Sequence, residues 1–327
     1  MKNIQHIFVI IVSSTIMICG TLSAQTQAFL DIGVNPRSEA LGATQFGSGA
    51  NALSIFTNPA QLAQISGLRA STVMTQWIAD ITHYGGAMTY NLGTPGTIGL
   101  TGIWMDYGTF TRTTGAPGTA DGYATTGEFS VTEYAIGVAY AHPLTSKLSL
   151  GGHLQYAALS LPTIASASGT VSDQATKSQM VFHVGTVYTP GWKHLRLGAH
   201  LQQSGLSPQG RQGALMPGQM TLGGALDLLE FLPGTGWARS SDLTLAYDWL
   251  QDRGARTRQH LGLEYALQDV LFLRGGYRFG YDQQGLTAGL GVRMLLGTTA
   301  LQVDYAYSDF GTYFGTVHRF GCGVALW

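Results

Sequence analysis

Serine, aspartate and histidine near the end of the chain are the residue types that could support nucleophilic chemistry. Ser308, Asp309 and His318 share one expected hairpin, so a Ser–His–Asp set could assemble there in space. The sequence contains no G-x-S-x-G nucleophile elbow, no H-E-x-x-H or C-x-x-C metal motif and no P-loop. The other histidines are scattered along expected strands and turns, where such a residue is usually structural. We therefore expect no enzyme, no metal site and no cofactor.

Charged side chains form a second group of interest, because they recur at every second position of otherwise apolar segments. In "RQHLGLEYAL", Leu261 and Leu263 alternate with His260 and Glu264. A period of two gives a β-strand one apolar and one polar face. The charged residues of such polar faces are Arg258, Glu264, Arg274, Arg278, Arg293, Asp304 and Arg319, with Asp242 and Asp248.

The composition indicates where the apolar faces point. Charged residues make up 11% of the 327 residues, while Gly contributes 45 and Tyr 15. Globular proteins carry about 25% charged residues. No mature segment reaches the roughly 20 apolar residues of a membrane helix. This combination is typical of a transmembrane β-barrel, and a soluble sandwich or barrel is the alternative. With 17 basic and 18 acidic residues and no basic cluster, nucleic-acid binding has no support.

Turn signals divide the chain into fourteen expected strands. They span 68–79, 83–91, 97–107, 128–141, 147–160, 178–189, 194–204, 217–229, 241–250, 257–267, 270–280, 285–296, 299–308 and 317–327. Long loops at 108–127, 161–177 and 205–216 lie at one end and short turns at the other, with 230–240 as the exception. Outer-membrane barrels show this asymmetry and an even strand number. We predict an all-β, 14-stranded antiparallel transmembrane barrel.

The membrane placement assigns the charged residues to the barrel interior. A charge facing lipid at the bilayer centre would cost about 2–4 kcal/mol. We therefore expect the charges above to form a network that fills and braces the lumen, and a polar permeation path is the alternative. Mid-strand glycines would let large lumen side chains or an inner plug approach the wall. They are Gly185, Gly198, Gly262, Gly276, Gly289 and Gly291.

The residues before the barrel divide into two expected parts. Residues 1–24 have a lysine, an apolar core and a small-residue exit, which indicates a secretory signal peptide and leaves Cys322 as the one mature cysteine. Residues 25–66 contain short apolar helices with strong caps, above all Asn58, Pro59 and Ala60. A fourteen-strand barrel leaves space inside. We expect 25–66 to form a helical plug and 67–327 to form the barrel.

Several stretches carry a resemblance to a known family. "FLDIGVNPRSEALGATQF", "NALSIFTNPAQLA" and "TQWIADITHYGGAMTYNL" are similar to the PorV/PorQ family within the FadL-like barrels, as is the closing "DYAYSDFGTYFGTVHRFGCGVALW". The Asn58-Pro59-Ala60 element is shared widely among FadL-like channels and so indicates the superfamily. The terminal Trp327 resembles the signal that the outer-membrane assembly machinery reads.

The resemblance implies a place in the outer membrane of a Gram-negative, Bacteroidetes- or Chlorobi-like bacterium. It further implies a role in type IX secretion, in which the barrel binds the C-terminal signal domain of secreted cargo and contacts a translocon or sortase. The binding surface would be the loops 108–127, 161–177 and 205–216, by analogy with the family. The alternative function is a FadL-like channel that holds a hydrophobic ligand in its lumen. A channel should show an apolar pocket near the plug; a secretion partner should show a broad docking surface.

Overall fold

The computed structural model describes residues 28–119, 121–160, 164–165, 171–172, 176–204, 218–231, 241–252 and 256–327. The expected signal peptide and the expected loop 205–216 lie outside the described residues, as does most of 161–177.

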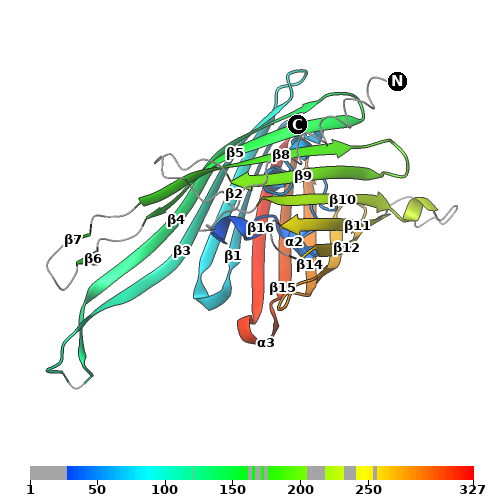
Figure 1. Cartoon of the computed structure of the whole chain (residues 1–327). Coiled ribbons are helices and arrows are strands. Elements are labelled where there is room, and N and C mark those ends of the chain that lie inside the picture. The colour runs from blue at the N-terminus through cyan, green and yellow to red at the C-terminus, as the bar shows by residue number, and fades with distance from the viewer. Residues whose placement is uncertain are drawn as a thin grey trace.

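Fourteen of the described strands close into one antiparallel barrel, in which β1 pairs with β16 (Figure 1). The strands are β1 Leu68–Gln76, β2 Thr82–Asn91, β3 Thr97–Gly115, β4 Tyr123–Pro143, β5 Leu148–Ser160, β8 Thr176–Tyr188, β9 Arg196–Ser204, β10 Gln219–Asp227, β11 Ser241–Asp252, β12 Arg258–Leu267, β13 Leu271–Phe279, β14 Leu286–Leu296, β15 Thr299–Asp309 and β16 Thr316–Leu326. A separate two-stranded sheet joins β6 Ile164–Ala165 to β7 Val171–Ser172. The expected fold is confirmed.

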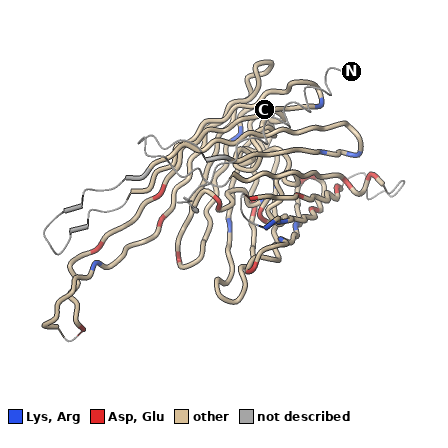
Figure 2. The backbone as a smooth tube through the Cα atoms, in the orientation of Figure 1, with Lys and Arg blue, Asp and Glu red and all other residues tan. Residues whose placement is uncertain are grey.

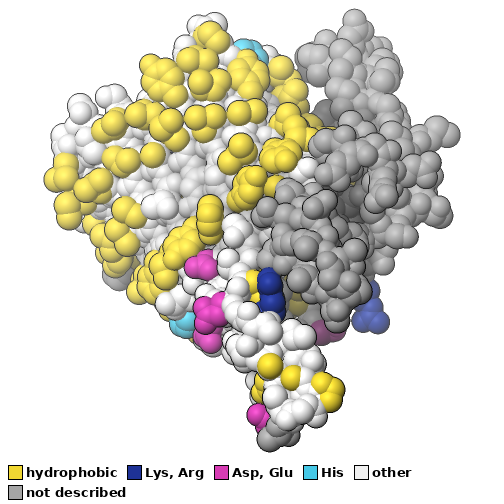
Figure 3. Space-filling model, turned by 90° about the vertical axis from the view of Figure 1, so that its left-hand side faces the viewer, with side chains coloured by type: hydrophobic (Ala, Val, Ile, Leu, Met, Phe, Trp, Pro, Cys, Tyr) yellow, Lys and Arg dark blue, Asp and Glu magenta, His cyan; other side chains and the backbone are white. Residues whose placement is uncertain are grey.

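Alternation of side chains decides what each face of the wall meets. Along β12, His260, Gly262 and Glu264 are buried, while Leu261 and Leu263 are exposed on the outside. Rows of hydrophobic side chains cover the outer wall (Figure 3). Such a surface suits lipid, and barrel closure pairs the backbone groups that lipid cannot hydrogen-bond. Among the described residues, no helix is long and apolar enough to cross a membrane.

Short helices before β1 fill the lumen. They are the 3-10 helix η1 Ala28–Asp31, the helix α2 Pro36–Ala40 and the 3-10 helices η2 Ala52–Phe56 and η3 Pro59–Gln64. α2 lies against β13–β16, and η3 lies against β4, β5 and β8. Asn35 caps α2, as its side chain accepts a hydrogen bond from the Arg37 backbone at 3.2 Å. The remaining short helices are η4 Ile78–Asp80, η5 Leu229–Phe231 and α3 Gly311–Phe314.

Glycines on the inner wall admit the plug. A Cβ at Gly276 would overlap the backbone of Gly42, and one at Gly185 would overlap the side chain of Asn58. Because the first of these contacts is with backbone, a larger side chain at Gly276 would displace the plug. Five of the six expected glycines lie against plug atoms, namely Gly185, Gly198, Gly262, Gly276 and Gly289. Gly291 instead makes room for side chains of the wall, Arg274 and Asp304.

The expected loop 108–127 is mostly strand, which corrects the sequence prediction. β3 and β4 stay paired as far as Gly115 opposite Tyr123, and this β3–β4 hairpin projects well beyond the barrel (Figure 1). The threonines and aromatics of the segment favour extended backbone. Apolar and polar residues alternate only weakly in this segment because both of its faces are exposed. A period of two therefore did not reveal the extension of the two strands. Irregularities in the register, one of them between Asp106 and Thr109, interrupt the ladder.

The outward face of β16 provides a direct test of the wall. Cys322 is exposed on the same face as Phe320 and is the free cysteine of the described residues. We expect a lipid-soluble maleimide to label Cys322 in proteoliposomes, whereas a charged, membrane-impermeant thiol reagent does not. The control is Thr114→Cys on a Cys322→Ser background, since Thr114 lies on the projecting hairpin and should react with the charged reagent. Equal rates at both positions would show that the assigned face is wrong.

Candidate functional site

The helix α2 is held across the lumen by ion pairs from two of its side chains. The Arg37 guanidinium donates to both carboxylate oxygens of Glu264, with its Nε 2.7 Å from Oε2. Glu264 also accepts from Arg274 at 2.7 Å, and Arg274 donates to Asp304 at 2.6 Å. These four residues, two acids and two bases, balance each other. Charged residues gather on the β11–β15 side of the barrel (Figure 2).

Glu39 makes the second connection between α2 and the wall. Its carboxylate lies 2.6 Å from the Arg278 guanidinium and 3.0 Å from that of Arg319. Although burial alone would raise the pKa of Glu39, the two guanidiniums hold it below its ordinary value. Arg319 also donates to the Gly33 carbonyl at 3.1 Å. We call the pairs Arg37–Glu264 and Glu39–Arg278/Arg319 the plug latch.

The expected lumen charges therefore do not form one network. Glu264, Arg274 and Asp304 lie together, while Arg278 and Arg319 meet only through Glu39 of the plug. Arg258 pairs instead with Asp252 at 2.7 Å. Arg293 lies 3.3 Å from Asp269 and is joined to Asp304 only through the neutral Gln302, by described hydrogen bonds of 3.2 and 2.7 Å. Asp248 is buried and accepts from the Gln45 backbone, and Asp242 is exposed near the strand end.

Sequence reasoning missed the plug's own charges. Arg37 and Glu39 stand two positions apart in "NPRSEALG", a segment otherwise read for its helix cap. Charged residues in a segment assigned to a barrel interior need partners, because an unpaired buried charge is costly. That requirement was a usable signal. The need for partners predicts that Arg37 and Glu39 pair with acids and arginines on the inner wall.

The Asn58-Pro59-Ala60 element joins the plug to the wall. The Asn58 amide nitrogen donates to the carbonyls of Thr186 at 3.2 Å and Ala199 at 3.3 Å, in β8 and β9. Its amide oxygen accepts from the Ala60 backbone at 3.0 Å and so caps η3. Asn58 is fully buried. One side chain therefore begins the helix and also anchors it.

A chamber of about 430 Å³ lies on the long-loop side of the plug. One part of its wall is apolar, formed by Leu30, Ile32, Phe56, Trp77, Ile103 and Phe310. Another part is polar and includes Asp31, His183, Gln202, Asp252, Arg258 and Tyr281. The rings of Trp77 and Phe310 meet edge to face at 5.1 Å. Burial, reinforced by Asp252, raises the pKa of Asp31 in the plug to about 6.

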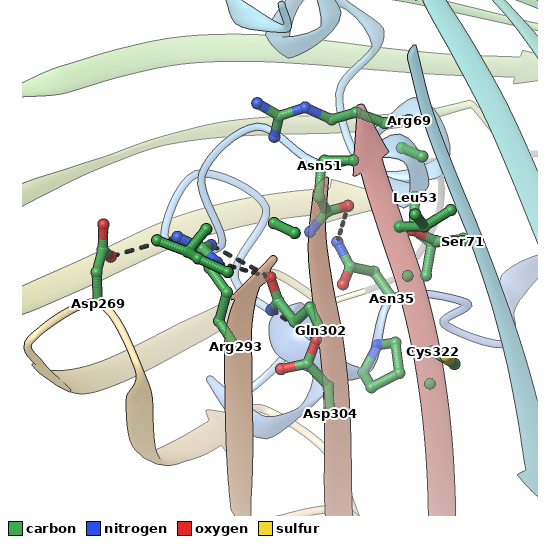
Figure 4. Close-up of a pocket in the computed structure, with 18 of the residues that line it drawn as sticks. Asn35, Asn51, Leu53, Arg69, Ser71, Asp269, Arg293, Gln302, Asp304 and Cys322 are labelled. Carbon is green, nitrogen blue, oxygen red and sulfur yellow. Dashed lines mark hydrogen bonds and ion pairs between the residues drawn. The ribbon is translucent and has the colours of Figure 1, made fainter. Parts of the chain in front are cut away.

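A second cavity of about 290 Å³ lies on the short-turn side, between the plug and β1, β14, β15 and β16 (Figure 4). Its lining includes Asn35, Asn51, Arg69, Arg293 and Val324. The chain from Val34 to Glu39 separates the two cavities, because Asn35 and Pro36 border this cavity while Val34 and Glu39 border the chamber.

The Ser–His–Asp set does not assemble. Ser308 faces the lumen and accepts from Arg319 at 3.1 Å. His318 points the other way, with its Nδ1 2.8 Å from the Tyr305 hydroxyl. The barrel wall separates the two side chains, so His318 cannot act as a base for Ser308.

Histidines gather elsewhere on the inner wall. His153, His183 and His200 stack from β5 to β9, with ring centroids 5.1 and 5.5 Å apart. Within the described residues, the group whose ligand atoms converge closely enough to hold a metal is His194, Asp227 and Glu230, at the short-turn end. There His194 already contacts Glu230 at 2.7 Å on the surface.

Comparison with known proteins identifies the fold. No family model and no curated protein matches the chain. The toluene transporter TbuX of Ralstonia pickettii matches with a TM-score of 0.54 and 14% identity over 90% of this chain and 97% of its own. The toluene transporter TodX of Pseudomonas putida matches with a TM-score of 0.53 and 12% identity over 89% of this chain and 97% of its own. A FadL homologue of Pseudomonas aeruginosa matches with a TM-score of 0.53 and 11% identity over 94% of this chain and 99% of its own.

These identities establish the fold alone. The chain has the fold of these outer-membrane barrels. They give no support to PorV/PorQ membership specifically, nor to a protein partner.

The plug latch can be tested by removing one charge. Glu39→Gln leaves Arg278 and Arg319 without their carboxylate, and breaking a buried ion pair costs about 3–5 kcal/mol. We expect a lower unfolding temperature and a larger single-channel conductance in planar bilayers. Glu128→Gln, on the exposed β3–β4 hairpin, is the control and should change neither. A Glu39→Gln protein that behaves as the wild type would mean that these ion pairs do not hold the plug.

Proposed function

We propose that the chain is an outer-membrane barrel that takes hydrophobic small molecules from the cell exterior into a plugged lumen. The observation that carries the proposal is the apolar wall of the chamber on the long-loop side, next to the plug. The fold is shared with the toluene transporters above, and transport is a property of those proteins. The lipid-facing outer surface supports the membrane placement. The division into signal peptide 1–24, plug 25–66 and barrel 67–327 remains a prediction.

The chamber offers an entering molecule two different surfaces. Leu30 and Ile32 of the plug and Ile103 of β3 supply apolar area, and burying such area contributes about 25 cal/mol per Å². Trp77 and Phe310 follow β1 and β15 at their long-loop ends, so the aromatic pair lies at the end of the lumen that faces the cell exterior. A compact apolar molecule would lie against these side chains, away from Asp252 and Arg258.

The plug latch sets the condition for passage. α2 stands between the chamber and the second cavity, held by carboxylate–guanidinium contacts on both sides. A molecule that crosses the lumen must therefore displace α2 or pass where the plug is held less firmly. The same latch retains bound molecules in the chamber while the plug is in place.

Truncation of the aromatic wall tests binding in the chamber. Phe310→Ala removes the ring that packs on Trp77, and such an aromatic contact is worth about 0.5–1.5 kcal/mol. Bound toluene would lose a ring contact of the same kind, so we expect radiolabelled toluene to bind the detergent-purified protein roughly two- to twelvefold more weakly. The matched control is Phe279→Ala on the lipid-facing side of β13, which should bind as the wild type does. Absence of toluene binding by the wild type, or equal loss in both variants, would contradict the proposal.

One observation favours a second function, in protein secretion. Beyond Asp106 of β3 and Thr132 of β4, no other described strand pairs with the β3–β4 hairpin. These two edges, unpaired among the described strands, could each accept an added strand from a partner. Phe110 and Tyr123 are exposed there, and Phe110 stacks on Phe129 at 5.4 Å. A secreted signal domain, a translocon or a sortase of a type IX system is the partner that the PorV/PorQ resemblance implies.

Shortening the hairpin separates the two functions. Replacement of residues 108–129 by a tight turn should leave toluene binding unchanged, because the chamber does not include them. If the secretion function holds, the same change should abolish recovery of translocon or sortase proteins from solubilised outer membranes. The milder double variant Phe110→Ser and Tyr123→Ser should reduce that recovery. If the wild type recovers no secretion component, the second function is wrong.

A further inference from the structure

The cavity on the short-turn side contains two arginines without a buried acidic partner. Arg69 enters it from β1 and Arg293 from β14 (Figure 4). Arg69 donates to the Ala50 carbonyl at 3.1 Å, its Nε is buried without a hydrogen-bond partner, and none of the described ion pairs includes it. Arg293 contacts the neutral Gln302 at 3.2 Å and Asp269 at 3.3 Å. The Asp269 side chain is 72% exposed, so this pair is solvated and weak.

Arg37 of the plug and Arg278 and Arg319 of the wall differ in this respect, whereas Arg196, beside Gly49 of the plug, resembles Arg69 in having a buried Nε without a hydrogen-bond partner. Arg37, Arg278 and Arg319 each contact a buried carboxylate of Glu264 or Glu39 at 3.0 Å or less. Arg69 and Arg293 therefore share a cavity with an unusual local charge.

The nearby acids do not neutralise that charge. Asp304 borders the cavity, but Arg274 occupies one of its oxygens at 2.6 Å and Gln302 the other at 2.7 Å. With Asp304 paired to Arg274, the remaining charged side chains of the lining are Arg69, Arg293 and Asp269, which sum to +1. A partly buried positive charge without a partner is costly, and an anionic ligand would remove the cost.

The rest of the lining indicates the body of such a ligand. Leu53 of the plug, Leu295 of β14 and Ala300 of β15 contribute apolar surface. Asn35 and Asn51 add amide groups beside it, joined by a hydrogen bond of 3.4 Å. A volume of about 290 Å³ admits a compact molecule rather than a long chain.

We propose that this cavity binds a small organic anion, a carboxylate or a phosphate, whose charged group lies between Arg69 and Arg293. Its apolar part would lie against Leu53, Leu295 and Ala300. The site lies across the plug from the chamber, so it does not depend on what the chamber binds. It gives the short-turn end of the barrel a ligand chemistry different from that of the long-loop end.

Calorimetry with charged and neutral probes of the same shape tests the proposal. Detergent-purified full-length protein should bind benzoate and phenyl phosphate, and should bind neutral benzamide at least tenfold more weakly. Arg69→Gln and Arg293→Gln should each weaken benzoate binding by roughly tenfold, the loss expected for one charge-assisted hydrogen bond. The control is Lys147→Gln, an exposed basic residue that lines neither cavity, which should bind benzoate as the wild type does. Heat-modifiable migration on gels verifies that each barrel is folded.

Lipid and soluble anions share this chemistry, and native mass spectrometry distinguishes the two sources. An anionic phospholipid retained by the wild type and lost in Arg69→Gln would identify the membrane as the source. Binding of benzoate by lipid-free protein, with no retained lipid, would identify a soluble anion. The proposal is overturned if benzoate and benzamide bind equally, or if both arginine variants bind benzoate with wild-type affinity. Loss of toluene binding in the chamber would leave these outcomes unchanged.

Discussion

The structure depends on one constraint: backbone groups within lipid must find their hydrogen-bond partners inside the protein. A closed ladder from β1 to β16 meets it, and alternation along each strand then places half of the side chains outside. Lipid requires those to be apolar. The charged residues that the strands carry are therefore confined to the lumen, where an unpaired charge is expensive. The need for a plug with charges of its own follows from this confinement.

Charge pairing and close backbone approach position the plug together. Arg37 and Glu39 give α2 ion pairs on different parts of the wall, and Asn58 fastens η3 to β8 and β9. These contacts form only because the wall has no side chain where the plug backbone passes, as at Gly276. Neither the ion pairs nor the glycines would position the plug alone. Long charged side chains permit movement, and glycines provide no attraction.

Sequence alone was enough for the barrel and only partly enough for its interior. The period of two located the strands closely, as in β14, expected at 285–296 and observed as Leu286–Leu296. It also placed Arg274 and Glu264 on the inner face. Period gives a side chain's face but not its partner across the lumen, which depends on barrel closure and on the path of the plug. The extension of β3 and β4 escaped notice because strands exposed on both faces need no apolar alternation.

Pairing of the lumen arginines divides the barrel interior into regions of different character. Where guanidiniums meet buried carboxylates, as around Glu39 and Glu264, the charges cancel and hold the plug in place. On the long-loop side, Arg258 is paired with Asp252 and much of the chamber wall is apolar, a setting that suits uncharged molecules. On the short-turn side, none of the described ion pairs includes Arg69, and Arg293 pairs with the exposed Asp269. The plug therefore separates two chemical environments. A molecule that crosses it would leave the apolar wall of the chamber and come close to the arginines of the second cavity.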